Sequence, residues 1–170
     1  MHFQGGLTIA EENFARAGRP GVLIASTLAG RSSAFSRPYQ DPRAFAELLA
    51  AGERALSEQF GRTLRFGEIL ITSFSAGYGA VRELLKEPGF FDRIEALVMA
   101  DSIYASLREG GVRRPNAEQM AGFVRFAEAA AQGDKVFVLT HTQIPTPYAS
   151  TRTPCRPAPV SYTHLRAHET

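Results

Sequence analysis

The sequence contains a single cysteine, Cys155, among its 170 residues. One cysteine excludes an intrachain disulfide framework and a thiolate metal site, so we expect no metal and no cofactor to be held in that way. No run of apolar residues reaches the roughly 18 that a membrane span needs. The N-terminus also lacks a basic segment followed by an apolar one, so nothing favours secretion and a cytoplasmic location is the default expectation.

The sequence has almost no excess of charge of one sign, since 19 basic residues stand against 17 acidic ones. The difference lies within residues 152–170, which hold three arginines and one glutamate and leave 16 basic and 16 acidic side chains elsewhere. A neutral remainder carries no basic field, so nucleic acid is not an expected partner. Hydrophobic residues at 44% and charged residues at 21% are typical of a soluble globular protein, here with room for one domain.

Apolar runs alternate with segments of helical periodicity along most of the chain. The pattern predicts helices over residues 8–17, 41–59, 76–86 and 117–131, and buried strands over residues 22–27, 69–73, 94–100 and 135–140. Such alternation predicts an α/β fold, with a mostly parallel sheet, helices on both faces and right-handed crossovers. In sheets of this kind the ligand site lies beyond the C-terminal ends of the strands.

Local signals predict where these elements begin and end. Thr8 and Glu11 have the spacing of a capping box, so we expect the first helix to start there. Residues 1–6 form a glycine-rich entry with no strand before it, and residues 28–40 form a polar loop. A Glu-Pro-Gly break at residues 87–89 separates the third helix from the next strand.

The stretch around Ser75 carries the main functional signal. The sequence Ser73-Phe74-Ser75-Ala76-Gly77 lies between a predicted buried strand and a predicted helix. A serine flanked two residues away on both sides by very small residues is typical of a nucleophile elbow. The turn is sharp and the serine backbone strained, so bulk at a flanking position would collide with a neighbouring element. An ordinary β-to-α turn is the alternative interpretation.

On this motif and its strand–turn–helix setting, the chain resembles the α/β-hydrolase family over about residues 2–150, with Ser73 where the familiar pattern has glycine. The resemblance implies a domain over residues 1–150 that is truncated at both ends. It also implies a serine hydrolase that acts on small-molecule esters or related acyl compounds without a metal or cofactor. Ser75 would be the nucleophile. The backbone N–H of Ala76 would be one oxyanion donor, and that of Gln4 or Phe3 the other.

Asp101 and His141 end the two predicted strands that follow the elbow. The resemblance implies Asp101 as the acid that orients the base, although the family usually carries it one strand later; the alternative is a turn cap. His141 is the candidate base, although the family usually brings its histidine one strand further on; the alternative is a wall of the site. The family's topology places the three strands side by side, so we expect Asp101 nearer to Ser75 than His141 is. On that geometry the chain is expected to be inactive for want of a base.

Two other functional interpretations remain open. Gly77-x-Gly79 follows a strand and opens a helix, and Asp101 ends the next strand, as in a dinucleotide-binding Rossmann-like protein. Against this, Arg82 occupies the third glycine position, where a side chain obstructs close packing of helix and strand. A hydrolase-fold protein without catalysis is the third interpretation, because a fold does not by itself imply a function.

The C-terminal segment differs from the rest in composition. Five prolines fall between residues 145 and 159, and residues 160–170 resemble translated sequencing-adapter read-through. We therefore expect residues 151–170 to be a disordered, artefactual tail without function, and we assign no role to its histidines.

Overall fold

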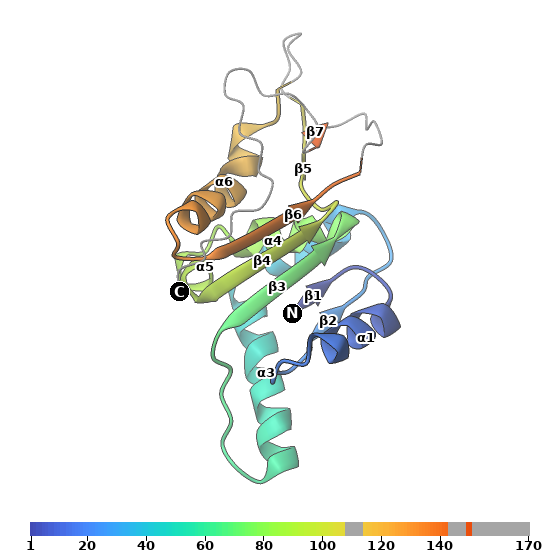
Figure 1. Cartoon of the computed structure of the whole chain (residues 1–170), viewed down its shortest axis with the longest axis vertical. Coiled ribbons are helices and arrows are strands. Elements are labelled where there is room, and N and C mark those ends of the chain that lie inside the picture. The colour runs from blue at the N-terminus through green and yellow to red at the C-terminus, as the bar shows by residue number, and fades with distance from the viewer. Residues whose placement is uncertain (108–113, 143–148, 151–170) are drawn as a thin grey trace.

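The computed structural model describes residues 1–107, 114–142 and 149–150. The predicted tail over residues 151–170 lies outside these ranges. The described chain folds around one parallel sheet with the strand order β2-β1-β3-β4-β6 (Figure 1), as the α/β alternation predicts. Its strands are β1 (His2–Phe3), β2 (Ala25–Ser26), β3 (Ile69–Phe74), β4 (Ile94–Ala100) and β6 (Val136–Thr140). Two further short strands, β5 (Tyr104–Ala105) and β7 (Ala149–Ser150), pair antiparallel with each other.

Capping residues account for the ends of the longer helices. At the start of α3 (Pro42–Phe60), the Asp41 side chain accepts a hydrogen bond from the Arg43 N–H at 3.0 Å. The same helix is capped at its C-terminus by Gly61 in the left-handed conformation. Asn116 accepts from the Gln119 N–H at 3.2 Å in the same way. The helices are α1 (Leu7–Ala17), α2 (Ser32–Ser36), α3 (Pro42–Phe60), α4 (Tyr78–Leu84), α5 (Pro88–Arg93) and α6 (Ala117–Ala131), with 3-10 turns η1 (Arg37–Tyr39) and η2 (Ser75–Gly77).

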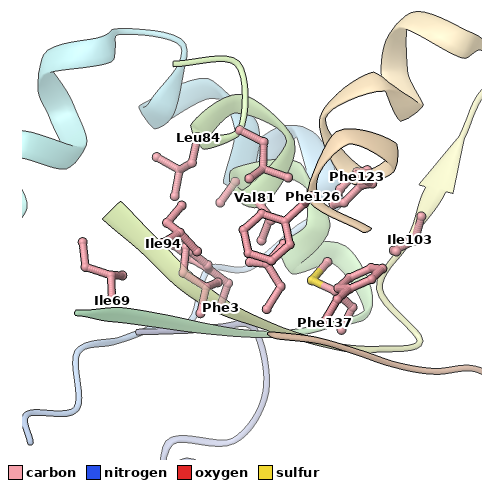
Figure 2. Close-up of a cluster of buried hydrophobic side chains, with 14 of the residues drawn as sticks. Phe3, Ile69, Val81, Leu84, Ile94, Ile103, Phe123, Phe126 and Phe137 are labelled. Carbon is pink, nitrogen blue, oxygen red and sulfur yellow. The ribbon is translucent and has the colours of Figure 1, made fainter. Parts of the chain in front are cut away.

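The direction in which the chain crosses the sheet places helices on both faces. The connection through α1 steps from β1 to β2, whereas the connections through α3, α4 and α6 step the opposite way across the sheet. Right-handed crossovers in opposite directions lie on opposite faces. The hydrophobic core lies under α3, α4 and α6, where Val81, Leu84, Phe123 and Phe126 meet the strands (Figure 2). The one buried residue of α1, Ala10, does not belong to that cluster.

The face of the sheet opposite the core is only partly covered within the described residues. Leu70, Phe74, Val136 and Val138 alternate along β3 and β6 with buried residues, and each is 40% to 53% exposed. Period-two alternation of this kind marks a strand with one face on the core. In the described ranges no helix is both long and apolar enough to cross a membrane.

The start of the chain differs from the sequence-based prediction. The helix does not begin at a Thr8 capping box, because α1 starts at Leu7 and its N-cap, Gly6, makes no side-chain hydrogen bond. The glycine-rich entry also contains a strand, since His2 and Phe3 pair with β2 on one side and with β3 on the other. A two-residue strand is too short to produce an alternating sequence pattern, which is why the sequence did not reveal it.

Other short elements also escaped the prediction. Only Ala25 and Ser26 of the predicted strand over residues 22–27 are paired, because β2 is an edge strand whose single partner, β1, is two residues long. The predicted loop over residues 28–40 contains α2 and η1, and the predicted break at residues 87–89 contains the start of α5. One or two helical turns do not show the 3.6-residue period from which helices are predicted.

Candidate functional site

The sheet has a topological switch point between β1 and β3. These neighbouring strands lead to α1 and α4, which lie on opposite faces of the sheet, so the segments that follow them separate. Ligands in open α/β sheets bind in the crevice that forms at such a point, outside the carboxyl ends of the strands. Phe3 is in register with Ser73, so Gln4 and Ser75 follow these two strands on either side of that position. Two of the predicted site residues therefore lie where a ligand crevice is expected.

Among the described residues other than glycine, three have positive φ angles. They are Gln4 with φ of 64°, Ser75 with φ of 45° and Asp101 with φ of 44°. Each residue directly follows the last residue of a parallel strand of the main sheet. Non-glycine residues with φ in this range are uncommon and cost roughly 1–3 kcal/mol each, and they gather at functional sites. The backbone strain of the described chain thus coincides with three of the sequence-predicted site residues.

Ser75 occupies the sharp turn that the sequence predicts. It follows the last residue of β3 directly, has φ of 45° and begins η2, which leads straight into α4. A Cβ atom on Gly77 would lie 2.5 Å from the Phe3 carbonyl oxygen and 2.7 Å from Ser73 Oγ. Only glycine fits at that position, because real Cβ atoms do not approach backbone so closely. The turn is therefore packed tightly against both β1 and β3.

Replacing Ser75 by glycine is expected to raise the free energy of unfolding by about 1 kcal/mol, because glycine adopts positive φ without steric cost. Differential scanning calorimetry or urea denaturation measures the change. Ser36→Gly is the matched control, since Ser36 has φ of −74° and glycine in a helix costs roughly 0.5 kcal/mol relative to serine. A loss of stability in Ser75→Gly equal to that of Ser36→Gly would contradict the strain at the elbow.

A pair of buried hydroxyl groups lies beneath the elbow. Ser102 Oγ donates a hydrogen bond to the Ser75 carbonyl oxygen at 2.9 Å, and Ser73 Oγ lies 2.6 Å from Ser102 Oγ. Ser73 is 1% exposed and Ser102 is 0% exposed. Sequence reasoning named Ser73 only as a small residue and missed Ser102. The sequence signal for Ser102 is weak, because its position next to Asp101 at a strand end does not reveal which groups it contacts.

The loop after β1 provides a second set of backbone groups at the switch point. The Gln4 N–H donates to the Ser26 carbonyl oxygen at 3.0 Å, so that group is engaged in pairing with β2 rather than free to bind an oxyanion. The next N–H groups along the chain, those of Gly5 and Gly6, make no backbone hydrogen bond within the described residues. Gln4 Oε1 is buried without a described partner. The free donors of this loop thus begin one residue beyond the predicted Gln4.

His2 supports this loop from the strand. Its Nδ1 lies 2.6 Å from Thr72 Oγ1, across the pairing of β1 with β3. A Cβ atom on Gly5 would lie 2.9 Å from His2 Nε2, and Gly5 has φ of 125°, so the position requires glycine. Burial lowers the pKa of His2 below its ordinary value of 6.5, against a hydrogen bond to the Gln4 backbone that raises the pKa. The imidazole is therefore neutral near pH 7 and fixes the loop at the elbow strand.

Asp101 lies one strand away from Ser75, at the end of β4. Phe74 is in register with Ala100, so Ser75 and Asp101 occupy corresponding positions. The Asp101 N–H donates to the Thr140 carbonyl oxygen at 2.8 Å. Its carboxylate accepts from the Thr142 N–H at 3.4 Å and from Thr142 Oγ1 at 3.2 Å, both long hydrogen bonds. The carboxylate is thus engaged by Thr142, and the structure does not join it to His141 by a hydrogen bond.

His141 lies one strand further on, after β6. Ala100 is in register with Thr140, so His141 stands level with Asp101 and two strands from Ser75. Parallel strands are about 4.8 Å apart, which makes the step from Ser75 to His141 about twice the step to Asp101. The strands of Ser75, Asp101 and His141 therefore lie side by side in the order predicted. The exposed His141 ring donates through Nδ1 to the Thr142 carbonyl oxygen at 3.1 Å, and within the described residues it makes no hydrogen bond to Ser75.

The glycines of the dinucleotide-like pattern serve backbone packing. Gly77 faces the Phe3 carbonyl, and a Cβ atom on Gly79 would collide with the Ser32 carbonyl oxygen of α2. Arg82, at the third glycine position, donates from Nη2 to the Tyr104 carbonyl oxygen at 2.6 Å. These contacts account for both glycines without a phosphate at the loop.

Within the described ranges, no group of three or more histidine, cysteine, aspartate or glutamate side chains is placed to hold a metal ion. Comparisons of the chain with protein families, with curated proteins and with solved structures give no match. The geometry at the switch point is therefore the basis on which a function can be proposed.

Proposed function

We propose that this chain carries the nucleophile and the oxyanion-binding groups of a serine hydrolase that acts on esters or related acyl compounds, in the manner of the α/β-hydrolase family. The observation that supports it most is the backbone of Ser75. A serine with φ of 45° stands at a strand-to-helix turn, next to the switch point of a parallel sheet. A strained serine at such a turn exposes its hydroxyl above the sheet, which acyl transfer requires of a nucleophile.

In this proposal Ser75 Oγ attacks the carbonyl carbon of the substrate, and the carbonyl oxygen takes up the negative charge. The Ala76 N–H lies at the start of a helical segment, where N–H groups have no intrahelical acceptor. It would donate to the oxyanion from one side of the crevice, and the Gly5 N–H from the other. Preorganised donors of this kind lower the barrier because they meet the charge that develops in the transition state. The mechanism uses no metal or cofactor.

We assign His141 to the wall of the site rather than to proton transfer. Asp101 stands between the strands of Ser75 and His141, and its carboxylate is engaged by Thr142. A general base needs to lie within about 3 Å of the proton that it accepts, or one water away. The proton of Ser75 would then leave to solvent, and the alcohol of the ester would depart with a proton taken from solvent. Acylation of this chain would be slow but selective for Ser75.

A fluorophosphonate probe followed by peptide mapping tests the proposal, because such a probe phosphonylates serines that face oxyanion donors. We expect the adduct on Ser75. Binding of a nicotinamide dinucleotide by a chain that the probe does not label would instead favour the dinucleotide-binding alternative.

The pH dependence of labelling tests the role of His141. Without a histidine base, the rate of Ser75 phosphonylation is expected to rise about tenfold per pH unit from pH 6 to 8, because hydroxide removes the proton. His141→Ala should change this rate by less than about twofold. A rate that levels off within this pH range, and a His141→Ala variant that has lost the plateau, would make His141 the base.

A further inference from the structure

The hydroxyl pair beneath the elbow has a defined hydrogen-bond direction. The Ser75 carbonyl oxygen can only accept, so Ser102 Oγ must use its single proton on it at 2.9 Å. Ser73 Oγ, 2.6 Å from Ser102 Oγ, therefore donates to Ser102. The three groups form a one-way chain from Ser73 through Ser102 to the Ser75 carbonyl.

This chain ends on the peptide that carries the proposed oxyanion donor. The Ser75 carbonyl and the Ala76 N–H belong to the same planar trans peptide, in which the C=O and N–H bonds point in opposite directions. The carbonyl accepts from Ser102 Oγ and also from the Tyr78 N–H of η2, and these bonds together aim the Ala76 N–H away from Ser102, toward the opposite side of the peptide. Successive hydrogen bonds in a dry interior also polarise one another, which makes the terminal N–H a stronger donor.

We propose that Ser73 and Ser102 are positioning residues, which orient and polarise the Ser75–Ala76 peptide so that the Ala76 N–H binds the oxyanion. This inference rests on the proposed function. It also explains why a serine stands at position 73, where the familiar elbow pattern has glycine. Both hydroxyls are buried, at 1% and 0% exposure, and each has its partner in this chain, so the arrangement is a built feature of the interior.

Labelling kinetics of variants test the proposal in the full chain, with the fluorophosphonate probe at varied concentration. Ser102→Ala should lower the maximal rate of Ser75 phosphonylation at least tenfold and leave the half-saturating probe concentration unchanged, because the donor acts on the transition state. Ser73→Ala should lower the same rate by a smaller factor. The double variant should be no slower than Ser102→Ala alone, since both residues act through one chain.

Ile94→Val is the control for a merely structural role. Ile94 is fully buried at the opposite end of β4, so this variant loses stability without touching the hydroxyl pair. When Ile94→Val loses as much melting temperature as Ser102→Ala, its Ser75 should still be labelled at the rate of the unsubstituted chain. A Ser102→Ala variant that labels at the unsubstituted rate, or no more slowly than Ile94→Val, would overturn the positioning role. If Ser102→Ala does not fold, Ser73→Gly serves in its place.

The amide proton of Ala76 gives a readout that does not depend on labelling. Loss of the polarising chain in Ser102→Ala should shift the Ala76 amide proton upfield in the NMR spectrum and leave the Gly5 amide unchanged. If the unsubstituted chain is not labelled at Ser75, the proposed function fails. The chemical shift of the Ala76 amide proton still tests whether the two hydroxyl groups polarise the Ser75–Ala76 peptide. An Ala76 resonance that does not move in Ser102→Ala would contradict the inference.

Discussion

Replacing Gly77 by alanine is expected to lower the free energy of unfolding by about 3 kcal/mol, the upper part of the range for an overpacked interior. The added Cβ atom would lie 2.5 Å from the carbonyl oxygen and 2.9 Å from the carbonyl carbon of Phe3. Phe3 cannot retreat easily, because it is fully buried and its strand is paired on both sides. The elbow and β1 would have to move apart. Chemical denaturation of the variant measures the loss.

Gly89→Ala is the matched control for this substitution. Gly89 also lies in a short helix, α5, but nothing approaches within 4 Å of the position that its Cβ would occupy. Alanine reduces the entropy of the unfolded chain, so Gly89→Ala should be neutral or stabilising by up to about 1 kcal/mol. Equal effects of the two substitutions would show that the close contact between the elbow and β1 does not exist in solution.

Replacing Ser75 by alanine is expected to abolish labelling of the elbow by the fluorophosphonate probe. In the unsubstituted chain Ser75 should react about a hundredfold faster than an exposed serine, because removal of a single oxyanion donor costs about 10²–10³ in rate in known hydrolases. Alanine keeps the Cβ atom and the backbone geometry, so the melting temperature should stay within about 2 °C of the original. Time-resolved mass spectrometry of the intact chain gives both rates.

Ser33→Ala provides the comparison for an unactivated serine. Ser33 is exposed in α2 and its side chain makes no hydrogen bond within the described residues, so this variant should label as fast as the unsubstituted chain. Undiminished labelling in Ser75→Ala, with loss in any other serine variant, would assign the nucleophile elsewhere.

Much of the architecture is predictable from the sequence because long elements carry repeated signals. β3, β4 and β6 are apolar runs, and α3 begins at a clear Asp41 cap. The sharp turn at Ser75 is predictable from five residues, because small residues are required at positions 73 and 77 where a strand turns sharply into a helix. The close fit of Gly77 against Phe3 confirms the need for glycine at that position.

The remaining features depend on tertiary contacts that no local pattern contains. β1 is recognisable only through its pairing with β2 and β3. The prediction of a capping box at Thr8 is wrong, because α1 starts one residue before Thr8. The sequence also could not show that Ser26 engages the Gln4 N–H or that Thr142 engages the Asp101 carboxylate. Backbone and side-chain groups from distant segments, here the Ser26 carbonyl and Thr142, determine which donors and acceptors are free once the sheet has formed.

The measurement that tests the central claim most directly is a crystal structure of the chain after treatment with the fluorophosphonate. The proposal predicts a covalent bond from Ser75 Oγ to phosphorus, with the phosphonyl oxygen about 3 Å from the backbone nitrogens of Ala76 and Gly5. An unmodified Ser75, or a phosphonyl oxygen that faces neither nitrogen, would contradict the assignment of Ser75 as the nucleophile at an oxyanion site.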